Sequence, residues 1–206
     1  MKKILLFIAL LSVSYLSLIG CTEKEGQQTE QNPLLNQELN ILFLGNSFTI
    51  DAVTHLPGML SAAGIKKVHM VQMYYGGRPV SQYVKGWDTF SDYTKYECLP
   101  GSNVWTETPN TNLAEVVSSK KWDIVTIQEH SGDAAAWTWN ATAKNNIQGL
   151  MDKVKAAQGA DEPEFYYILS QAYSDNAKIG QASRPSITWT DHAGMWAVVS
   201  AFGRKV

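Results

Sequence analysis

The chain has 206 residues, a formal net charge of −2 and 45% hydrophobic residues. This length suits a single folded domain, and a charged fraction of only 17% excludes a wholly disordered chain. The charge is nearly balanced and no basic stretch occurs, so no nucleic-acid partner is expected. Two cysteines exclude both a disulfide scaffold and a four-cysteine zinc site.

The chain begins with a predicted targeting segment. A basic start over residues 1–3 precedes an apolar run over 4–19, which leads into Gly20 and Cys21. This order is typical of a secretory signal peptide, here over residues 1–20. The Gly-Cys end resembles the lipobox of bacterial lipoproteins, in which the cysteine is lipidated. The resemblance implies export and anchoring to a bacterial membrane through Cys21, in the periplasm or at the cell surface. A chance cysteine after an ordinary signal peptide is the alternative.

Residues 21–38 are polar and predict a flexible tether, followed by a folded domain over 39–206. Residues 80–110 show no clear period and are expected to be mostly irregular. The predicted elements, in chain order, are a strand over 41–44, a helix over 55–63, a strand over 68–73, a short helix over 80–84, a helix over 112–119, a strand over 123–127, a helix over 141–157, a strand over 165–169 and a helix over 190–204.

Strands that alternate with helices predict an α/β protein with a parallel sheet covered on both faces. Ligands of such sheets bind beyond the carboxyl ends of the strands. Candidate functional residues should therefore follow the strands, within 45–49, 74–78, 128–133 and 170–176.

Three of these strand ends carry residues suited to chemistry. Ser47 lies in a sharp turn after the first strand, where it is either an exposed nucleophile or a helix cap. A glycine pair, Gly76 and Gly77, lets a backbone N–H approach a ligand or forms a plain turn. Gln128 can donate to a developing oxyanion. His130 is either functional or an ordinary loop histidine, and no second cluster of ligands supports a metal site with Glu129.

The turn Gly45-Asn46-Ser47 resembles the first sequence block of the SGNH/GDSL hydrolases. The chain is most similar to an SGNH-like branch of exported bacterial proteins catalogued as a domain of unknown function. The resemblance implies a flavodoxin-like, three-layer α/β/α sandwich and cofactor-independent hydrolysis of esters, often acetyl esters of carbohydrates. The stretches that carry it are ILFLGNSFTIDA, MYYGGRPV, WDIVTIQEHSG and LSQAYSDN.

The same resemblance implies roles for individual residues. Ser47 is the expected nucleophile, and the N–H groups of Ser47 and Gly77 are expected oxyanion donors. The family takes a third donor from an Asn in a Gly-x-Asn-Asp loop. This chain lacks that loop, and Gln128 is the nearest substitute. No metal is expected, and the walls of the site are expected to include Asn46, Gly76, Ser131 and Tyr173.

The family's acid and base come from an Asp-x-x-His block, and this sequence has no such spacing. Asp191 and His192 are adjacent and are expected at the start of the last helix, with Thr190 or Asp191 as its cap. We therefore expect a C-terminally truncated domain that lacks a strand and a helix, with the histidine base supplied from beyond Val206. The expected function is a lipid-anchored serine esterase that deacylates carbohydrate esters. A non-catalytic, glycan-binding lipoprotein of the same fold is the alternative.

Tryptophan is abundant, with seven residues. Trp122 and Trp196 are expected in the core. Four others, in loops or at a helix start, either stack on sugar rings, which favours a glycan ligand, or pack the 80–110 segment onto the domain. These loop residues are Trp87, Trp105, Trp137 and Trp139.

Overall fold

The computed structural model describes residues 35–137, 141–172, 191–204 and 206. The predicted signal peptide, Cys21 and most of the predicted tether lie outside these residues, and so does Tyr173. Within the part that is described, no helix combines the length and the apolar character needed to cross a membrane.

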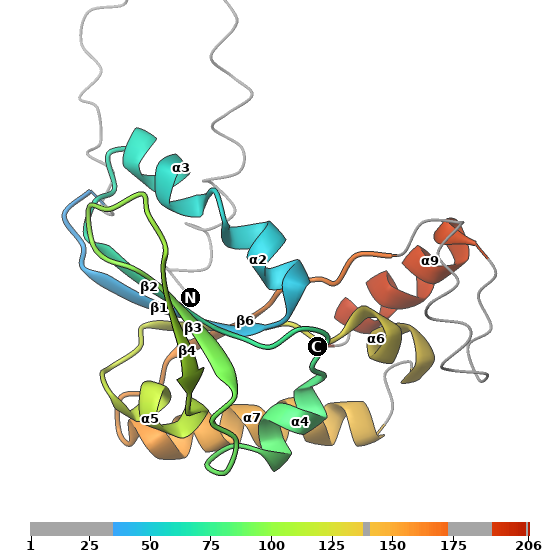
Figure 1. The fold of residues 1–206 in the computed structure, drawn as a ribbon. Coiled ribbons are helices and arrows are strands. Elements are labelled where there is room, and N and C mark those ends of the chain that lie inside the picture. Colours follow the sequence, from blue (N-terminus) through green and yellow to red (C-terminus); the bar gives the residue numbers. More distant parts are fainter. Residues whose placement is uncertain (1–34, 138–140, 173–190, 205) are drawn as a thin grey trace, which may run out of the picture. The chain divides into compact units, whose positions relative to one another are not determined.

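A six-stranded mixed sheet forms the centre of the domain (Figure 1). Its order is β4-β3-β2-β1-β5-β6; β2, β1, β5 and β6 are parallel, and β3 and β4 are antiparallel to their neighbours. The predicted α/β class and its four parallel strands are confirmed. The strands are β1 (Leu39–Gly45), β2 (Val68–Tyr74), β3 (Tyr93–Cys98), β4 (Thr106–Thr111), β5 (Ile124–Ile127) and β6 (Glu164–Tyr167).

Helices cover both faces of this sheet, as a three-layer sandwich requires. In Figure 1, α4, α5 and α7 lie on one face, and α2 and α3 lie on the other. Helices α6 and α9 contact each other. The helices are α2 (Ser47–Val53), α3 (Leu56–Ala62), α4 (Val80–Lys85), α5 (Leu113–Ser118), α6 (Ser131–Trp137), α7 (Ala141–Gln158) and α9 (His192–Gly203).

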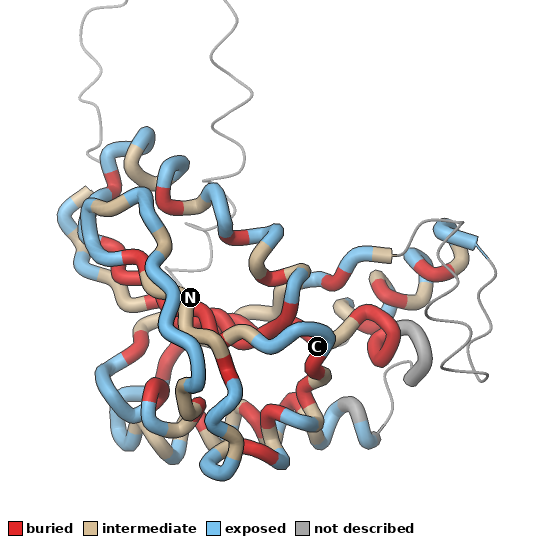
Figure 2. Tube along the Cα trace, in the orientation of Figure 1, coloured by how far each residue is buried: buried red, intermediate tan, exposed pale blue. Residues whose placement is uncertain are grey.

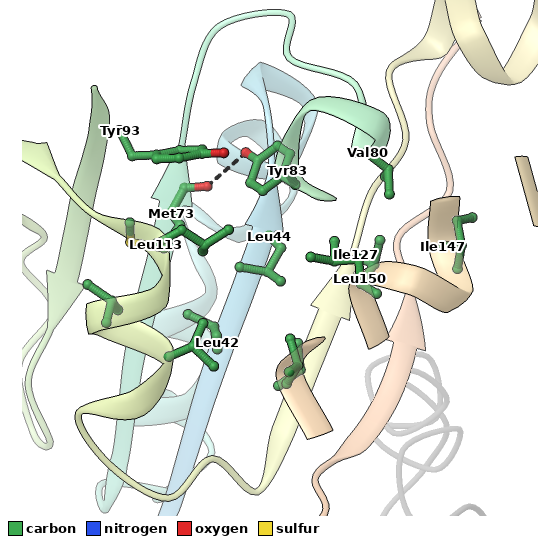
Figure 3. Packing of buried hydrophobic residues seen from close by; sticks show 14 of the residues in the cluster. Leu42, Leu44, Met73, Val80, Tyr83, Tyr93, Leu113, Ile127, Ile147 and Leu150 are labelled. Atoms are coloured by element: carbon green, nitrogen blue, oxygen red, sulfur yellow. Dashed lines mark hydrogen bonds between the residues drawn. The ribbon is translucent and has the colours of Figure 1, made fainter. Parts of the chain in front are cut away.

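Much of the core lies between the sheet and the layer of α4, α5 and α7, and buried residues of α6 and α9 belong to the same cluster. Leu42 and Leu44 project from β1 toward Leu113 of α5 and Leu150 of α7, and all four side chains are buried (Figure 3). Figure 2 shows the same concentration of buried residues along the central strands. A strand buried on both faces needs a continuous apolar run, which is why the 41–44 segment is readable in the sequence.

A buried tyrosine fixes α4 near the carboxyl ends of two strands. The hydroxyl of Tyr83 donates to the carbonyl of Gly45 at 2.6 Å and to that of Met73 at 3.0 Å. The ring is 1% exposed and packs against Tyr93, with ring centroids 5.1 Å apart. The helix after the glycine pair is thereby held against the ends of β1 and β2.

The expectation that residues 80–110 are mostly irregular is wrong. Beyond α4, this segment contains β3 and most of β4, which extend the sheet as an antiparallel hairpin. The sequence of β4, TETPNT, is polar, and five of its six residues are exposed. Backbone pairing rather than apolar burial makes it a strand, so hydrophobic periodicity cannot reveal it. Asn110 in this strand has a positive φ of 55°.

Two helices were also missed, α2 and α6, and each has only seven residues. Their sequences, SFTIDAV and SGDAAAW, place few large apolar residues at helical spacing, so no clear helical period marks them. The predicted cap of the last helix is confirmed, because Asp191 accepts from the N–H of Gly194 at 2.7 Å. The carboxylate of Asp191 therefore stabilises the start of α9.

The structure separates the core tryptophans from the others. Trp122 is 1% exposed, as predicted, whereas the prediction for Trp196 is wrong because its side chain is 44% exposed on α9. Trp105 donates from its indole N–H to the carbonyl of Thr54 at 3.2 Å. This contact packs the loop of the hairpin onto the domain, which is one of the two roles expected for the loop tryptophans.

Candidate active site

Ser47 lies at the surface in a tight turn between β1 and α2. Asn46 caps the helix with its side-chain oxygen, which accepts from the N–H of Phe48 at 3.3 Å. A Cβ atom at Gly45 would overlap the hydroxyl of Thr49, so the close turn requires glycine there. Ser47 is the first residue of α2 and is exposed, whereas Asn46 is buried. The turn thus presents the Ser47 hydroxyl at the carboxyl edge of the sheet.

The glycine pair forms a second turn at the same edge. The N–H of Arg78 donates to the carbonyl of Tyr75 at 3.3 Å, and Gly77 has a positive φ of 67°. Asn46 donates from its side-chain amide to the carbonyl of Arg78 at 3.5 Å, which joins the two turns. Among the described residues, neither the N–H of Ser47 nor that of Gly77 has a hydrogen-bond partner. The predicted nucleophile and the two predicted backbone donors are therefore brought to neighbouring turns.

Gln128 does not point a donor into the site, which corrects its predicted role. Its side-chain N–H groups donate to the carbonyl of Glu129 and to the hydroxyl of Ser170, the latter at 3.0 Å. Its oxygen accepts from the N–H of Asn46 at 3.1 Å and from the hydroxyl of Thr49 at 3.2 Å. The residue is 0% exposed. With both donors used internally, the amide links the ends of β1, β5 and β6.

A buried carboxyl group lies next to Gln128. Glu129 is 3% exposed, and its Oε1 accepts from the N–H of Val80 at 3.0 Å and of His130 at 2.8 Å. Burial raises the pKa of Glu129 to about 7, against the opposing effect of these two hydrogen bonds. The carboxyl group connects the first residue of α4 to the segment that enters α6.

His130 forms a pair with an acidic residue that the sequence analysis did not single out. Its Nδ1 lies 3.0 Å from Oδ2 of Asp133, and Asp133 is 3% exposed. The imidazole is 22% exposed. An oriented histidine beside a buried carboxylate is the arrangement that supports a general base in hydrolases. In the sequence, the three-residue spacing between His130 and Asp133 is a signal for this pair. That spacing brings the two side chains together only if a helix forms there, and the sequence of α6 has no clear apolar pattern that would predict one.

The remaining predicted wall residues divide between the surface, the interior and the undescribed part. Gly76 is exposed beside Gly77. Ser131 is 0% exposed, so it does not line an open surface. Tyr173 lies outside the described residues. No group of three or more His, Cys, Asp or Glu side chains suited to a metal ion occurs within the described part of the chain.

The fold and this edge define an α/β sandwich with an exposed serine at a strand-to-helix turn. Residues 40–184 match the family described as "Domain of unknown function (DUF4886)", and the chain belongs to this family. Comparison with curated proteins gives no match.

Two solved structures are similar. A DUF4886 family protein from Bacteroides uniformis superposes with a TM-score of 0.67 at 21% identity, over 82% of this chain and 62% of the other. A protein from Slackia heliotrinireducens, proposed to be an SGNH hydrolase, gives a TM-score of 0.49 at 19% identity, over 82% and 73%. The chain thus spans 62% of the length of the Bacteroides relative.

Replacing Gln128 by Ala should lower the free energy of unfolding by about 2–4 kcal/mol, because buried groups of Asn46, Thr49 and Ser170 lose their partner. Urea denaturation of both proteins measures this difference. Gln148→Ala is the matched control, since Gln148 is exposed on α7, and should change stability by about 0.5 kcal/mol or less. Equal effects of the two substitutions would contradict the role assigned to Gln128.

Glu129 should make stability depend on pH. Its pKa in the folded protein, about 7, exceeds its ordinary value of 4.5, so folding retains a proton that the unfolded chain has released. The free energy of unfolding should therefore fall as pH rises from 5 to 8, by about 2 kcal/mol from this group. Glu129→Gln keeps an acceptor oxygen but does not titrate, and should remove this part of the slope. Parallel stability curves for the two proteins would show that Glu129 does not carry it.

Proposed function

We propose that this protein is an SGNH-like serine ester hydrolase that uses Ser47 as its nucleophile. The observation that carries the proposal is the joined pair of turns at the edge of the sheet. One turn presents the exposed Ser47 hydroxyl, and the hydrogen bond from Asn46 to Arg78 holds the other turn beside it. No described residue accepts a hydrogen bond from the N–H of Ser47 or of Gly77, so both groups are available to a ligand within this part of the chain.

The proposed reaction follows from these groups. The Ser47 oxygen attacks the ester carbonyl carbon while a base takes its proton, and the carbonyl oxygen gains a negative charge. The N–H groups of Ser47 and Gly77 stabilise this charge. Collapse of the intermediate breaks the bond to the alcohol, which leaves with the proton from the base. A water molecule then hydrolyses the acyl-Ser47 ester and returns the serine to its starting form.

His130 is the candidate base that the described residues support. It follows β5, the parallel neighbour of β1, and Asp133 orients its ring. A carboxylate in this position stabilises the imidazolium that forms when the serine loses its proton. The carboxyl group of Glu129 accepts from the backbone N–H of His130 and so fixes the main chain to which the imidazole is attached.

The substrate and location belong to the same proposal. We propose an acylated carbohydrate as substrate and a lipid on Cys21 as the membrane anchor of an exported protein. The lipobox-like sequence at 20–21 supports the anchor, and the carbohydrate ester comes from the family resemblance of the Gly45-Asn46-Ser47 turn. A glycan-binding protein without catalysis is the competing function, and the absence of serine reactivity would favour it.

Ser47→Ala should abolish covalent labelling by a fluorophosphonate probe and hydrolysis of p-nitrophenyl acetate. The expected loss is at least about 1,000-fold, since the proposed nucleophile is removed. Intact-mass spectrometry detects the labelled protein, and absorbance detects the released p-nitrophenol. Ser118→Ala is the control, because Ser118 is also an exposed serine in a short helix. Labelling that persists in the Ser47 variant would contradict the assignment.

His130→Ala should slow labelling of Ser47 by about 100-fold or more if His130 is the base. The rate should be measured from pH 6 to 9, since a serine without its base gains reactivity as hydroxide concentration rises. His55→Ala provides the comparison, because His55 is the N-cap residue of α3 and its replacement should leave the rate unchanged. Equal labelling rates in the wild-type and His130→Ala proteins would remove His130 from the mechanism while leaving Ser47 in place.

A further inference from the structure

An arginine directly after the glycine pair is buried and held on several sides. Arg78 is 5% exposed, and its two terminal nitrogens lie 2.9 and 2.8 Å from the two carboxylate oxygens of Asp92. Its guanidinium carbon lies 3.5 Å from the ring centroid of Tyr75, 4.5 Å from that of Tyr93 and 4.9 Å from that of Phe90. Such a two-pronged ion pair with aromatic stacking defines both the position and the orientation of the guanidinium.

The backbone of Arg78 also takes part in hydrogen bonds to both turns. Its N–H donates to Tyr75 and its carbonyl accepts from Asn46, so the residue closes the glycine turn and joins it to the serine turn. Val80, two residues later, donates to the buried carboxyl group of Glu129. Between Tyr75 and Arg78 lie only Gly76 and Gly77, which have the greatest backbone freedom of any residues.

We propose that Arg78, clamped by Asp92 and the rings of Tyr75, Tyr93 and Phe90, is the positioning residue that holds the N–H of Gly77 for the oxyanion. This inference rests on the proposed function of Ser47. Two glycines in sequence lose much conformational entropy when a turn is ordered. A donor helps a transition state only when its position is set beforehand, so the clamp supplies the order that the glycines lack.

An ordinary surface ion pair would not serve this purpose. Exposed pairs contribute little to stability and hold no fixed geometry. Here the arginine side chain is 4% exposed although its partner Asp92 is 51% exposed, so the buried member is the one attached to the turn. The guanidinium lowers the pKa of Asp92, as expected for a carboxylate that remains ionised in this pair. The carboxylate can therefore be neutralised by substitution at a half-exposed position, without opening a cavity in the core.

Asp92→Asn is the test, with Asp92→Glu as the conservative rescue. On p-nitrophenyl acetate, Asp92→Asn should lower kcat at least about 10-fold and leave KM within about two-fold, since an oxyanion donor acts mainly in the transition state. Asp92→Glu should recover much of kcat because it restores the carboxylate. Asp161→Asn is the matched control, because Asp161 forms an exposed ion pair with Lys121 at 2.8 Å and should change neither constant.

Hydrogen exchange of the full chain measures the ordering of the glycine turn by the Arg78–Asp92 pair independently of catalysis. In Asp92→Asn, the amide of Arg78, whose N–H donates to the carbonyl of Tyr75, should exchange faster than in the wild type and in Asp161→Asn. Unchanged exchange there, or a kcat within two-fold of the wild type, would overturn the inference while the function of Ser47 stands. A wild-type protein with no Ser47-dependent turnover would overturn the proposed function itself, and the catalytic part of this inference with it.

Discussion

The buried amide of Gln128 is the interaction on which the candidate site depends. Its oxygen accepts from the backbone of Asn46 and from Thr49, while its nitrogen donates to Ser170 and to the backbone of Glu129. An amide can fill these positions because it offers acceptor and donor atoms at opposite ends. The ends of β1, β5 and β6 are thus held in one arrangement, and the Ser47 turn takes its position from that arrangement.

Further hydrogen bonds connect the groups around Gln128 to the glycine turn. Asn46 bonds to the backbone of Arg78, and Glu129 bonds to the backbone of Val80 just beyond it. The turn is therefore fixed from the serine side and from the side of α4. Buried polar groups are costly unless they are paired, so such a connected network favours one conformation over alternatives with broken pairs. This constraint explains why the edge contains so many buried polar side chains.

The sequence predicts the parts of this site that depend on local pattern. The apolar run that ends at Gly45 and the glycines that follow β2 mark strand ends, and strand ends of a parallel sheet meet at one edge. The orientation of Gln128 could not be predicted, because its partners Thr49 and Ser170 come from distant segments. The His130–Asp133 pair depends on a short helix without apolar periodicity, and Asp92 reaches Arg78 through a loop before an unpredicted strand.

Strand β4, one of the two edge strands of the described sheet, has a consequence for association between molecules. An edge strand offers a row of backbone groups that can pair with a strand from another chain. Pro109 removes one donor from this row, the positive φ of Asn110 interrupts its extended geometry, and Glu107 adds a charge to the exposed surface. These features discourage continuation of the sheet beyond β4. The polar sequence that conceals this strand from pattern analysis thus also guards the domain against edge-to-edge aggregation.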